Sequence, residues 1–119
     1  MARATITLDY PPNIGDYSDN KYYSGKHWNK RRADADYWHD RLQYEAPWNR
    51  PPLKSPVKLT FYWNDRLNLS NHGMLAKMIE DGIKHRIIQD DSRKHVAEIV
   101  HRWHDENKIK IVVEEVDDD

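Results

Sequence analysis

The chain has 119 residues, of which 38% are hydrophobic and 33% are charged, so it is long enough for one domain with a single small core. It contains no cysteine, which excludes a disulfide framework and a thiolate zinc site. No apolar run approaches the ~18 residues of a membrane span, and the first ten residues lack the apolar stretch of a signal peptide. We therefore expect a soluble cytoplasmic protein that does not contact a membrane.

The formal net charge of −1 hides an uneven distribution along the chain. Removing the five acidic side chains of residues 114–119, "EEVDDD", changes the net charge to +4. We divide the chain into a mildly basic body, residues 1–116, and an acidic tail, residues 117–119. Five Trp and seven Tyr stand against one Phe, and Tyr and Trp are suited to interfaces and nucleic-acid stacking as well as to cores.

The N-terminal region predicts a strand followed by a long loop. Around Ile6 and Leu8, apolar and polar side chains alternate as in a half-buried strand. Pro11 and Pro12 end it, because proline cannot donate to a strand ladder. Residues 13–28 are rich in Gly, Asp, Asn, Ser and Tyr, and we expect them to form a long loop that is either functional or mobile.

A helix and a linker are predicted next. Residues 29–46 contain neither Gly nor Pro, Asn29 can cap the helix, and Trp38 and Leu42 contribute to an apolar stripe. Residues 47–56 hold four prolines, which is typical of a linker or clamp loop.

The second half of the chain predicts a strand, a turn and a helix. Residues 57–63, "VKLTFYW", place a large apolar side chain at every second position, as in a strand with one buried face. The polar turn "NDRLNLSNHG" follows. In "MLAKMIEDGIKH", residues 74–85, Met, Leu and Ile recur at helical spacing, and we expect this stripe in the core.

The C-terminal region admits two interpretations. Apolar side chains in residues 94–104 recur at helical spacing, whereas "KIKIVVEEV" alternates as a strand. The intervening "HDENK" suits a hairpin turn between two strands. Pattern alone leaves helix and strand open for residues 94–104.

The segment "KYYSGKHWNKRR", residues 21–32, is a candidate nucleic-acid-binding surface. Its five cations alternate with three aromatic side chains, a mixture suited to phosphate neutralisation and base stacking. Cations in the first turn of a helix oppose the helix dipole, so an external anion would explain them. A solvated loop is the alternative interpretation. The candidate DNA-binding residues here are Lys21, Lys26, Trp28, Lys30, Arg31 and Arg32.

Adjacent carboxylates at Asp90 and Asp91 are the candidate metal ligands. Mg²⁺-dependent phosphodiester hydrolysis needs several oxygen ligands from separate segments, often with a lysine nearby. The turn "NDRLNLSN" is the candidate second segment, and Lys77 lies one or two helical turns beyond it. A solvated turn is the alternative, because paired aspartates are common in turns. The seven histidines form no HExxH motif, and we interpret His101 and His104 as structural or surface residues.

The order of these motifs resembles the RusA family of Holliday-junction resolvases, which is common in phages and prophages. The likeness covers about residues 4–116 and rests on "PPN" after the first strand, the basic loop and helix, "NLSN", "LAKMIEDGI", "IIQDDS" and a closing hairpin. It implies an α+β fold with a small mixed or antiparallel sheet and two main helices. It also implies a homodimer, and a strand at residues 94–104.

The resemblance implies a site for Mg²⁺, with Mn²⁺ as the alternative metal. Asn68 and Ser70 stand where the family has its first two aspartates, and we expect Asp65 to restore one carboxylate. The implied catalytic residues are Asp91, Asp90, Lys77 and Asp65. The implied metal ligands are Asp91, Asp90, Asp65, Asn68 and Ser70. The basic residues Arg93 and Lys94 would grip DNA phosphates together with residues 21–32.

The expected function is Mg²⁺-dependent cleavage of branched DNA during phage recombination or repair, in the cytoplasm of a bacterial host. A catalytically silent junction-binding protein of the same fold is the first alternative, and the two substituted aspartate positions favour it. A small interaction protein without a DNA role is the second alternative. Absent or salt-insensitive DNA binding would indicate the latter, because phosphate contacts weaken with salt.

Overall fold

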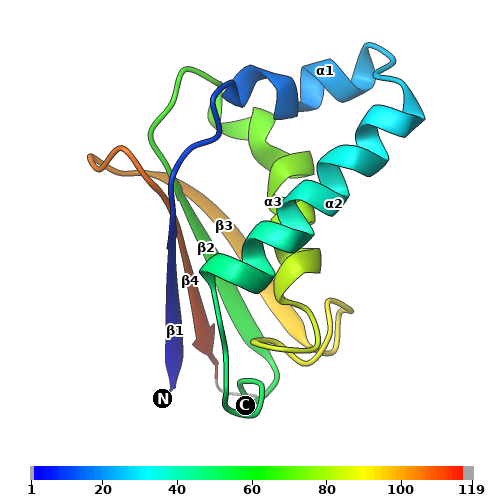
Figure 1. The fold of residues 1–119 in the computed structure, drawn as a ribbon. Coiled ribbons are helices and arrows are strands. Elements are labelled where there is room, and N and C mark those ends of the chain that lie inside the picture. The colour runs from blue at the N-terminus through cyan, green and yellow to red at the C-terminus, as the bar shows by residue number, and fades with distance from the viewer. Residues whose placement is uncertain (1, 117–119) are drawn as a thin grey trace.

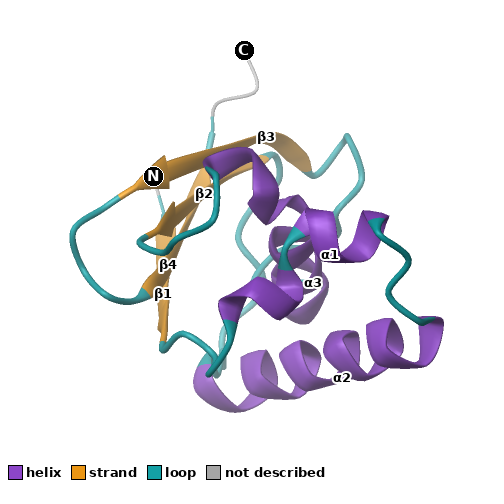
Figure 2. Cartoon of the chain, turned by 90° about the horizontal axis from the view of Figure 1, so that it is seen from above, coloured by secondary structure: helices purple, strands orange, loops and turns teal. Residues whose placement is uncertain are grey.

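Four strands form one mixed sheet, and the helices lie on one of its faces (Figures 1 and 2). This computed structural model describes residues 2–116, so the predicted acidic tail, residues 117–119, lies outside the described residues. The α+β fold with a small mixed sheet is confirmed. No helix within residues 2–116 has the length and apolar character needed to cross a membrane. The elements are β1 (Arg3–Leu8), η1 (Ile14–Tyr17), α1 (Asp19–Tyr23), α2 (Trp28–Glu45), β2 (Val57–Trp63), η2 (Leu69–His72), α3 (Gly73–Ile83), β3 (Val96–Trp103) and β4 (Ile109–Glu115).

The strand order β1–β4–β2–β3 overturns the predicted closing hairpin. β4 runs antiparallel to both β1 and β2, whereas β3 pairs in parallel with β2 at the edge of the sheet. β2 therefore separates β3 from β4, which a hairpin would have joined. Burial agrees with the edge position of β3: Ile109, Ile111 and Val113 of β4 are buried in the middle of the sheet, whereas every side chain of β3 is at least partly exposed.

Residues 96–103 form a strand, as the resemblance implied and against their helical spacing. Val96, Ile99 and Val100 are β-branched, which favours an extended backbone. Strand β3 sits at the sheet edge beyond the cover of the helices, so Ile99 and Trp103 stay 47% and 49% exposed. The helical periodicity therefore did not correspond to a buried face.

The core fills the space between the sheet and the helices. All four apolar side chains predicted to share one face of β2 are buried, and so are Trp38 and Leu42 of α2. The stripe of α3 is likewise in the core, as expected. Gly82 allows α3 to approach α2 closely, because a Cβ there would lie 2.8 Å from the Cβ of Leu42. This contact fixes the two main helices against each other.

Residues 13–28 are more ordered in structure than the predicted loop. Asn13 caps η1 through Gly15 N–H, and Ser18 caps α1 through Lys21 N–H, so two short helices replace the loop. Helix α2 begins at Trp28, one residue before the predicted cap at Asn29. The ring of His27 supplies the cap instead, accepting the Asn29 N–H at 3.2 Å.

Candidate functional site

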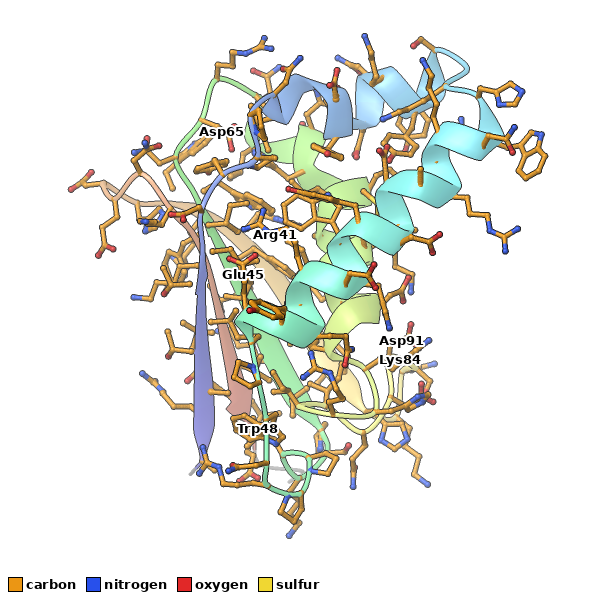
Figure 3. All side chains as sticks on the ribbon, in the orientation of Figure 1. Arg41, Glu45, Trp48, Asp65, Lys84 and Asp91 are labelled. Atoms are coloured by element: carbon orange, nitrogen blue, oxygen red, sulfur yellow. The ribbon has the colours of Figure 1, made fainter. Side chains whose placement is uncertain are left out.

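The carboxylates predicted to share a metal site lie near different ends of α3. Asp65 follows β2 and hydrogen-bonds to His72, the residue that precedes α3, whereas Asp91 contacts side chains further along the helix. Figure 3 shows Asp65 and Asp91 well apart. The structure therefore does not bring Asp65 to Asp90 and Asp91, as the predicted ligand set required.

Both carboxylate oxygens of Asp65 accept hydrogen bonds from neighbouring groups. We call Tyr10, Asp65, Leu67 and His72 the Asp65 cluster. The carboxylate accepts the Tyr10 hydroxyl at 2.9 Å, the Leu67 N–H at 2.9 Å and His72 Nε2 at 2.9 and 3.0 Å from its two oxygens. The Asp65 side chain is only 5% exposed, and His72 is stacked on Trp63 with ring centroids 4.2 Å apart. A metal could reach Asp65 only by displacing these donors.

The pKa of Asp65 reflects the same contacts. Burial alone would raise it, but the hydrogen bonds from His72 and Leu67 outweigh burial and hold the pKa below its usual value. Burial raises the pKa of Tyr10, whose hydroxyl also accepts the Asn64 N–H at 2.6 Å. Asp65 is thus an ionised, buried hydrogen-bond acceptor that ties the end of β2 to the start of α3.

Near the other end of α3, ion pairs surround Lys77; we call Lys77, Glu80, Asp81, Lys84 and Asp91 the Asp91 cluster. The Lys77 Nζ atom lies 2.7 Å from Asp91 Oδ2, 3.4 Å from Asp81 Oδ1 and 3.6 Å from Glu80 Oε1. Lys84 Nζ is 3.8 Å from Asp91, and Figure 3 shows the two side by side. Of the predicted catalytic residues, the structure therefore brings Lys77 and Asp91 together.

The charges of the Asp91 cluster are largely matched internally. The hydrogen bond from Lys77 lowers the pKa of Asp91, and the same bond raises the pKa of Lys77. Burial raises the pKa of Glu80, although Lys77 partly offsets it. The Lys77 ammonium thus occupies the position among these carboxylates that a divalent cation would have to take. Within residues 2–116, no group of three or more His, Asp or Glu side chains is arranged to hold a metal.

The other predicted ligands are not directed to a shared site. Asp90 Oδ1 accepts the Asp91 N–H at 2.9 Å, which favours the interpretation of this pair as a turn. Asn68 precedes η2 without a side-chain capping bond, and Ser70 lies within η2. Among the described residues, neither Asn68 nor Ser70 hydrogen-bonds through its side chain to Asp90 or Asp91. The residues present do not form the Mg²⁺ or Mn²⁺ ligand set implied by the resemblance.

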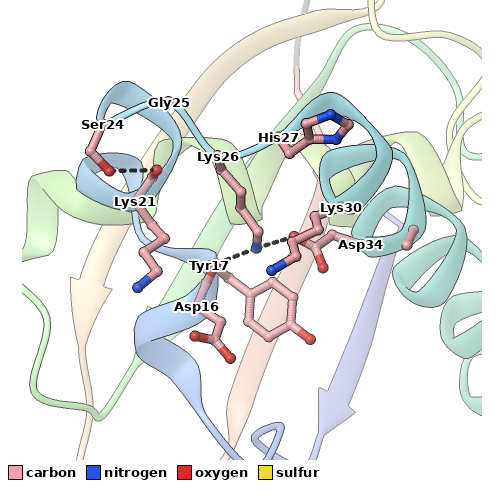
Figure 4. Close-up of a pocket in the computed structure, with 10 residues that line it drawn as sticks. Asp16, Tyr17, Lys21, Ser24, Gly25, Lys26, His27, Lys30 and Asp34 are labelled. Carbon is pink, nitrogen blue, oxygen red and sulfur yellow. Dashed lines mark hydrogen bonds and ion pairs between the residues drawn. The ribbon is translucent and has the colours of Figure 1, made fainter.

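A basic pocket of about 610 Å³ opens between α1 and the start of α2. Lys21 comes from α1, and His27 and Lys30 come from the start of α2. The lining also includes Tyr17, Ser24, Lys26 and two carboxylates, Asp16 and Asp34. Figure 4 shows the Lys21 and Lys30 side chains extending toward Tyr17. Neither ammonium is ion-paired within the described part of the chain, so both are available to an anion.

Two of the predicted DNA-binding cations instead hold the wall of this pocket. Lys26 pairs with Asp34, donates to the Asp16 carbonyl at 2.7 Å and lies over the rings of Tyr17 and Tyr22.

Arg31 donates to the Lys26 carbonyl at 2.8 Å and to the Tyr22 carbonyl, and it lies over the Tyr22 ring. The structure therefore shows a second role for Lys26 and Arg31, which the sequence did not predict. Both side chains thus secure the loop, while Arg31 stays exposed, and a contact of either with DNA remains a prediction.

Exposed aromatic rings lie beside the basic pocket. Trp28 is 64% exposed and Tyr23 is 80% exposed, and the His27 ring is stacked on Trp28 with centroids 6.0 Å apart. Arg32 is exposed on α2 close by in sequence. Aromatic rings beside unpaired lysines are the combination that single-stranded nucleic acids bind by stacking and phosphate contacts.

The second predicted basic cluster lies elsewhere. The loop that carries Arg93 and Lys94 is near the far end of α3 from α1 (Figure 1). Both residues are exposed, and Arg93 lines a groove together with Glu80 and Asp91. The residues predicted to bind DNA therefore fall on two separate surfaces.

Several residues of these clusters were missed by sequence reasoning. Glu80, Asp81 and Lys84 follow Lys77 by three, four and seven positions, so helical spacing could have placed them on its face. For Tyr10 and His72, no sequence signal pointed to Asp65.

Comparisons with known proteins add no family assignment. No protein-family model matches the chain, and no curated protein is significantly similar to it in sequence.

Proposed function

We propose that this protein binds DNA through its basic pocket, with branched DNA as the preferred form, and that it does so without cleaving the DNA. The observation that carries the proposal is the combination of two ammonium groups, Lys21 and Lys30, that have no ion pair within residues 2–116, with the exposed rings of Trp28 and Tyr23. Lysines neutralise phosphates, and exposed rings stack on the faces of bases. An open four-way junction exposes the faces of the base pairs at its branch point, whereas a continuous duplex covers them by stacking.

The preference for branched DNA rests on the resemblance in motif order, and the absence of cleavage rests on the geometry near α3. Lys77 neutralises Asp91, and hydrogen bonds occupy Asp65, so the carboxylates do not converge on a free position. In a phage or prophage setting, such a protein would act on recombination or repair intermediates in the bacterial cytoplasm.

Metal-dependent cleavage is the second candidate function, and one observation favours it. Asp91 and Lys77 are in contact beside Glu80 and Asp81, and Arg93 lines the groove next to them. In that case Lys77 would stabilise charge on the phosphate, as the resemblance implies.

The deciding experiment uses a labelled four-way junction, a matched duplex and a matched single strand. Fluorescence anisotropy in Ca²⁺ over a series of salt concentrations measures binding, and gel analysis in Mg²⁺ or Mn²⁺ measures cleavage. We expect tighter binding to the junction than to the duplex and no nicks. Paired nicks that disappear in Asp91→Asn would establish the second candidate and overturn the first.

The binding surface is tested by the double variant Lys21→Gln/Lys30→Gln. Each lysine that contacts a phosphate contributes about one to the slope of log affinity against log salt, so the double variant should lose about two. Lys54→Gln, at an exposed lysine outside both basic segments, is the matched control and should leave the slope unchanged. Trp28→Ala should weaken junction binding without changing the slope. Equal slopes for wild type and double variant would place the contact elsewhere.

A further inference from the structure

The basic pocket is mixed in charge, because two of the residues that line it are aspartates. The carboxylate of Asp34 is neutralised within the wall by its ion pair with Lys26. The carboxylate of Asp16 is exposed and forms no hydrogen bond or ion pair within residues 2–116. The pocket therefore offers one unoccupied acceptor group in addition to the ammonium groups of Lys21 and Lys30.

The cationic groups and this acceptor occupy different parts of the pocket. Figure 4 shows Asp16 at the end of the pocket opposite Ser24. The Lys21 and Lys30 side chains reach into the space between these two ends, and neither is ion-paired with Asp16. A ligand that carries a negative group at one position and hydrogen-bond donors at another therefore fits this arrangement.

The size and the net charge of the pocket fit one nucleotide of a DNA strand. Its volume of about 610 Å³ lies within the range of about 300–1,000 Å³ that small-ligand sites occupy, and a duplex is too large to enter it. Three lysines and two aspartates line the pocket, so with His27 neutral its net charge is +3 − 2 = +1. A nucleotide within a strand has a neutral base and one negative charge, on its phosphate.

The carboxylate of Asp16 favours guanine over the other bases. The two oxygens of a carboxylate accept two hydrogen bonds side by side, as they do from the guanidinium of arginine. On its Watson–Crick edge, guanine alone among the four DNA bases has two adjacent donors, N1–H and the N2 amino group. Adenine, cytosine and thymine each set an acceptor next to their single donor group, and that acceptor would face a carboxylate oxygen.

A nucleotide must leave the base stack to enter the pocket, because the pocket is recessed between α1 and the start of α2. Extrusion costs least where a base already lacks a pairing or stacking neighbour, as it does at a branch point. The exposed rings of Tyr23 and Trp28 lie beside the pocket and are placed to stack on the bases that remain. Extrusion therefore gives a physical reason for a preference for branched DNA over duplex.

We propose that the basic pocket binds a single guanine nucleotide extruded from the branch point of DNA. The phosphate of this nucleotide contacts Lys21 and Lys30, and the guanine N1–H and N2 amino group donate to the two carboxylate oxygens of Asp16. The inference rests on the proposed function, because it names the part of branched DNA that the pocket holds. Lys21 and Lys30 then supply affinity for any strand, and Asp16 supplies the base preference.

Short single strands measure the base preference without the cost of unpairing. Labelled strands of thymidine with one central guanine, adenine or cytosine are compared with the all-thymine strand by fluorescence anisotropy. We expect the guanine strand to bind about tenfold tighter than the others, as one bidentate base contact provides. Hypoxanthine lacks the N2 amino group and should lose most of this gain, whereas 7-deazaguanine keeps the Watson–Crick edge and should retain it. Equal affinities for guanine and hypoxanthine would overturn the proposal.

The variant Asp16→Asn tests the residue that reads the base. An amide has one acceptor oxygen where the carboxylate has two, so we expect about tenfold weaker binding of the guanine strand. The all-thymine strand should bind slightly tighter, because a negative charge has been removed. Asp36→Asn, at an exposed aspartate of α2 outside the pocket lining, is the matched control and should change neither affinity. An equal loss for both strands in Asp16→Asn would overturn the role of Asp16.

Branched DNA tests the extrusion step. Two junctions are compared that differ only in one unpaired base at the branch point, which is guanine in one and thymine in the other. We expect the guanine junction to bind about tenfold tighter and this difference to disappear in Asp16→Asn. A guanine preference in single strands that is absent from the junctions would overturn binding at the branch point.

Failure of this inference and failure of the proposed function give different results. Strand binding that depends on Lys21 and Lys30 but shows no preference for guanine would overturn the guanine contact and leave DNA binding in place. If no strand or junction binds, the proposed function is overturned together with the inference. Isothermal titration calorimetry with guanosine 5′-monophosphate then distinguishes the source of the ligand, because binding of the free nucleotide alone would exclude DNA as that source.

Discussion

The Asp65 cluster and the Asp91 cluster differ in what they leave available. At Asp65, three groups donate to a carboxylate that is almost entirely buried, and no charged side chain there reaches solvent. At Asp91, a half-exposed lysine lies 2.7 Å from one carboxylate and 3.4 and 3.6 Å from two others. A carboxylate can serve a metal only when it has free lone pairs and access to solvent. The comparison shows that two aspartates near the same helix have different roles: Asp65 accepts buried hydrogen bonds that stabilise the fold, and Asp91 forms solvent-accessible ion pairs.

The largest expected effect comes from breaking the Asp65 cluster. Asp65→Asn keeps the shape but removes the charge and sets an NH₂ group among buried donors, so we expect the free energy of unfolding to fall by about 3 kcal/mol. Urea denaturation measures it. Asp105→Asn, at an exposed aspartate, is the control and should change stability by less than about 0.5 kcal/mol. Equal effects of the two variants would show that the Asp65 hydrogen bonds do not stabilise the fold.

A smaller effect is expected from breaking the Asp91 cluster. Lys77→Met should lower the free energy of unfolding by at most about 1 kcal/mol, because the Lys77 side chain is 53% exposed and solvent screens its ion pairs. The pKa of Asp91, followed by NMR, should rise toward its usual value, since the hydrogen bond from Lys77 is what lowers it.

Lys108→Met is the matched control for Lys77→Met. It breaks a pair between exposed Lys108 and Asp9 and should leave both overall stability and the Asp91 pKa unchanged. A fall in stability at Lys77 as large as that of Asp65→Asn would remove the distinction between the two clusters.

The two clusters should also respond to acid with opposite signs. Burial raises the pKa of Glu80 in the folded state, so Glu80 favours folding below its unfolded pKa of about 4.3 and disfavours it as the pH rises above that value. Glu80→Gln should therefore stabilise the protein slightly at neutral pH, and the gain should vanish on acidification.

At Asp65 the folded pKa is lowered, so its contribution is present above about pH 3.9 and is lost as the pH falls through the folded pKa. The difference in stability between wild type and Asp65→Asn should therefore shrink in acid. Urea denaturation at neutral and acidic pH checks both signs. A stabilising effect of Glu80→Gln that grows in acid would contradict the assignment for Glu80.

Local patterns predicted most of the fold. Alternation predicted β1, β2 and β4, and helical spacing predicted α2 and α3, because these signals depend on neighbouring residues alone. The order of β3 and β4 could not be predicted in this way. Which strand occupies the centre of a sheet depends on how much apolar surface each strand buries, and that depends on the whole fold.

The candidate site was less predictable for the same reason. The resemblance placed Lys77 with Asp91, and the structure brings them together. The state of Asp65 depends on Tyr10, which is 55 residues away in sequence, and on His72. Nothing in the pattern around Asp65 distinguishes a metal ligand from a buried acceptor, because both use the same carboxylate.

The smallest expected effect comes from adding carboxylates near the start of α3 and asking whether they can act together with Asp91. Asn68→Asp/Ser70→Asp restores the aspartates of the family pattern, yet it adds them beside η2, and no side-chain hydrogen bond within the described residues links these positions to Asp91. We therefore expect no nicking of a four-way junction in Mg²⁺ or Mn²⁺ and no metal-dependent rise in Tm. Because Asn68 and Ser70 are exposed, the variant should fold as the wild type does. Nicking that appears in this variant and disappears when Asp91→Asn is added would mean that η2 can reach Asp91, so the separation of the two clusters would then describe a resting arrangement rather than a permanent one.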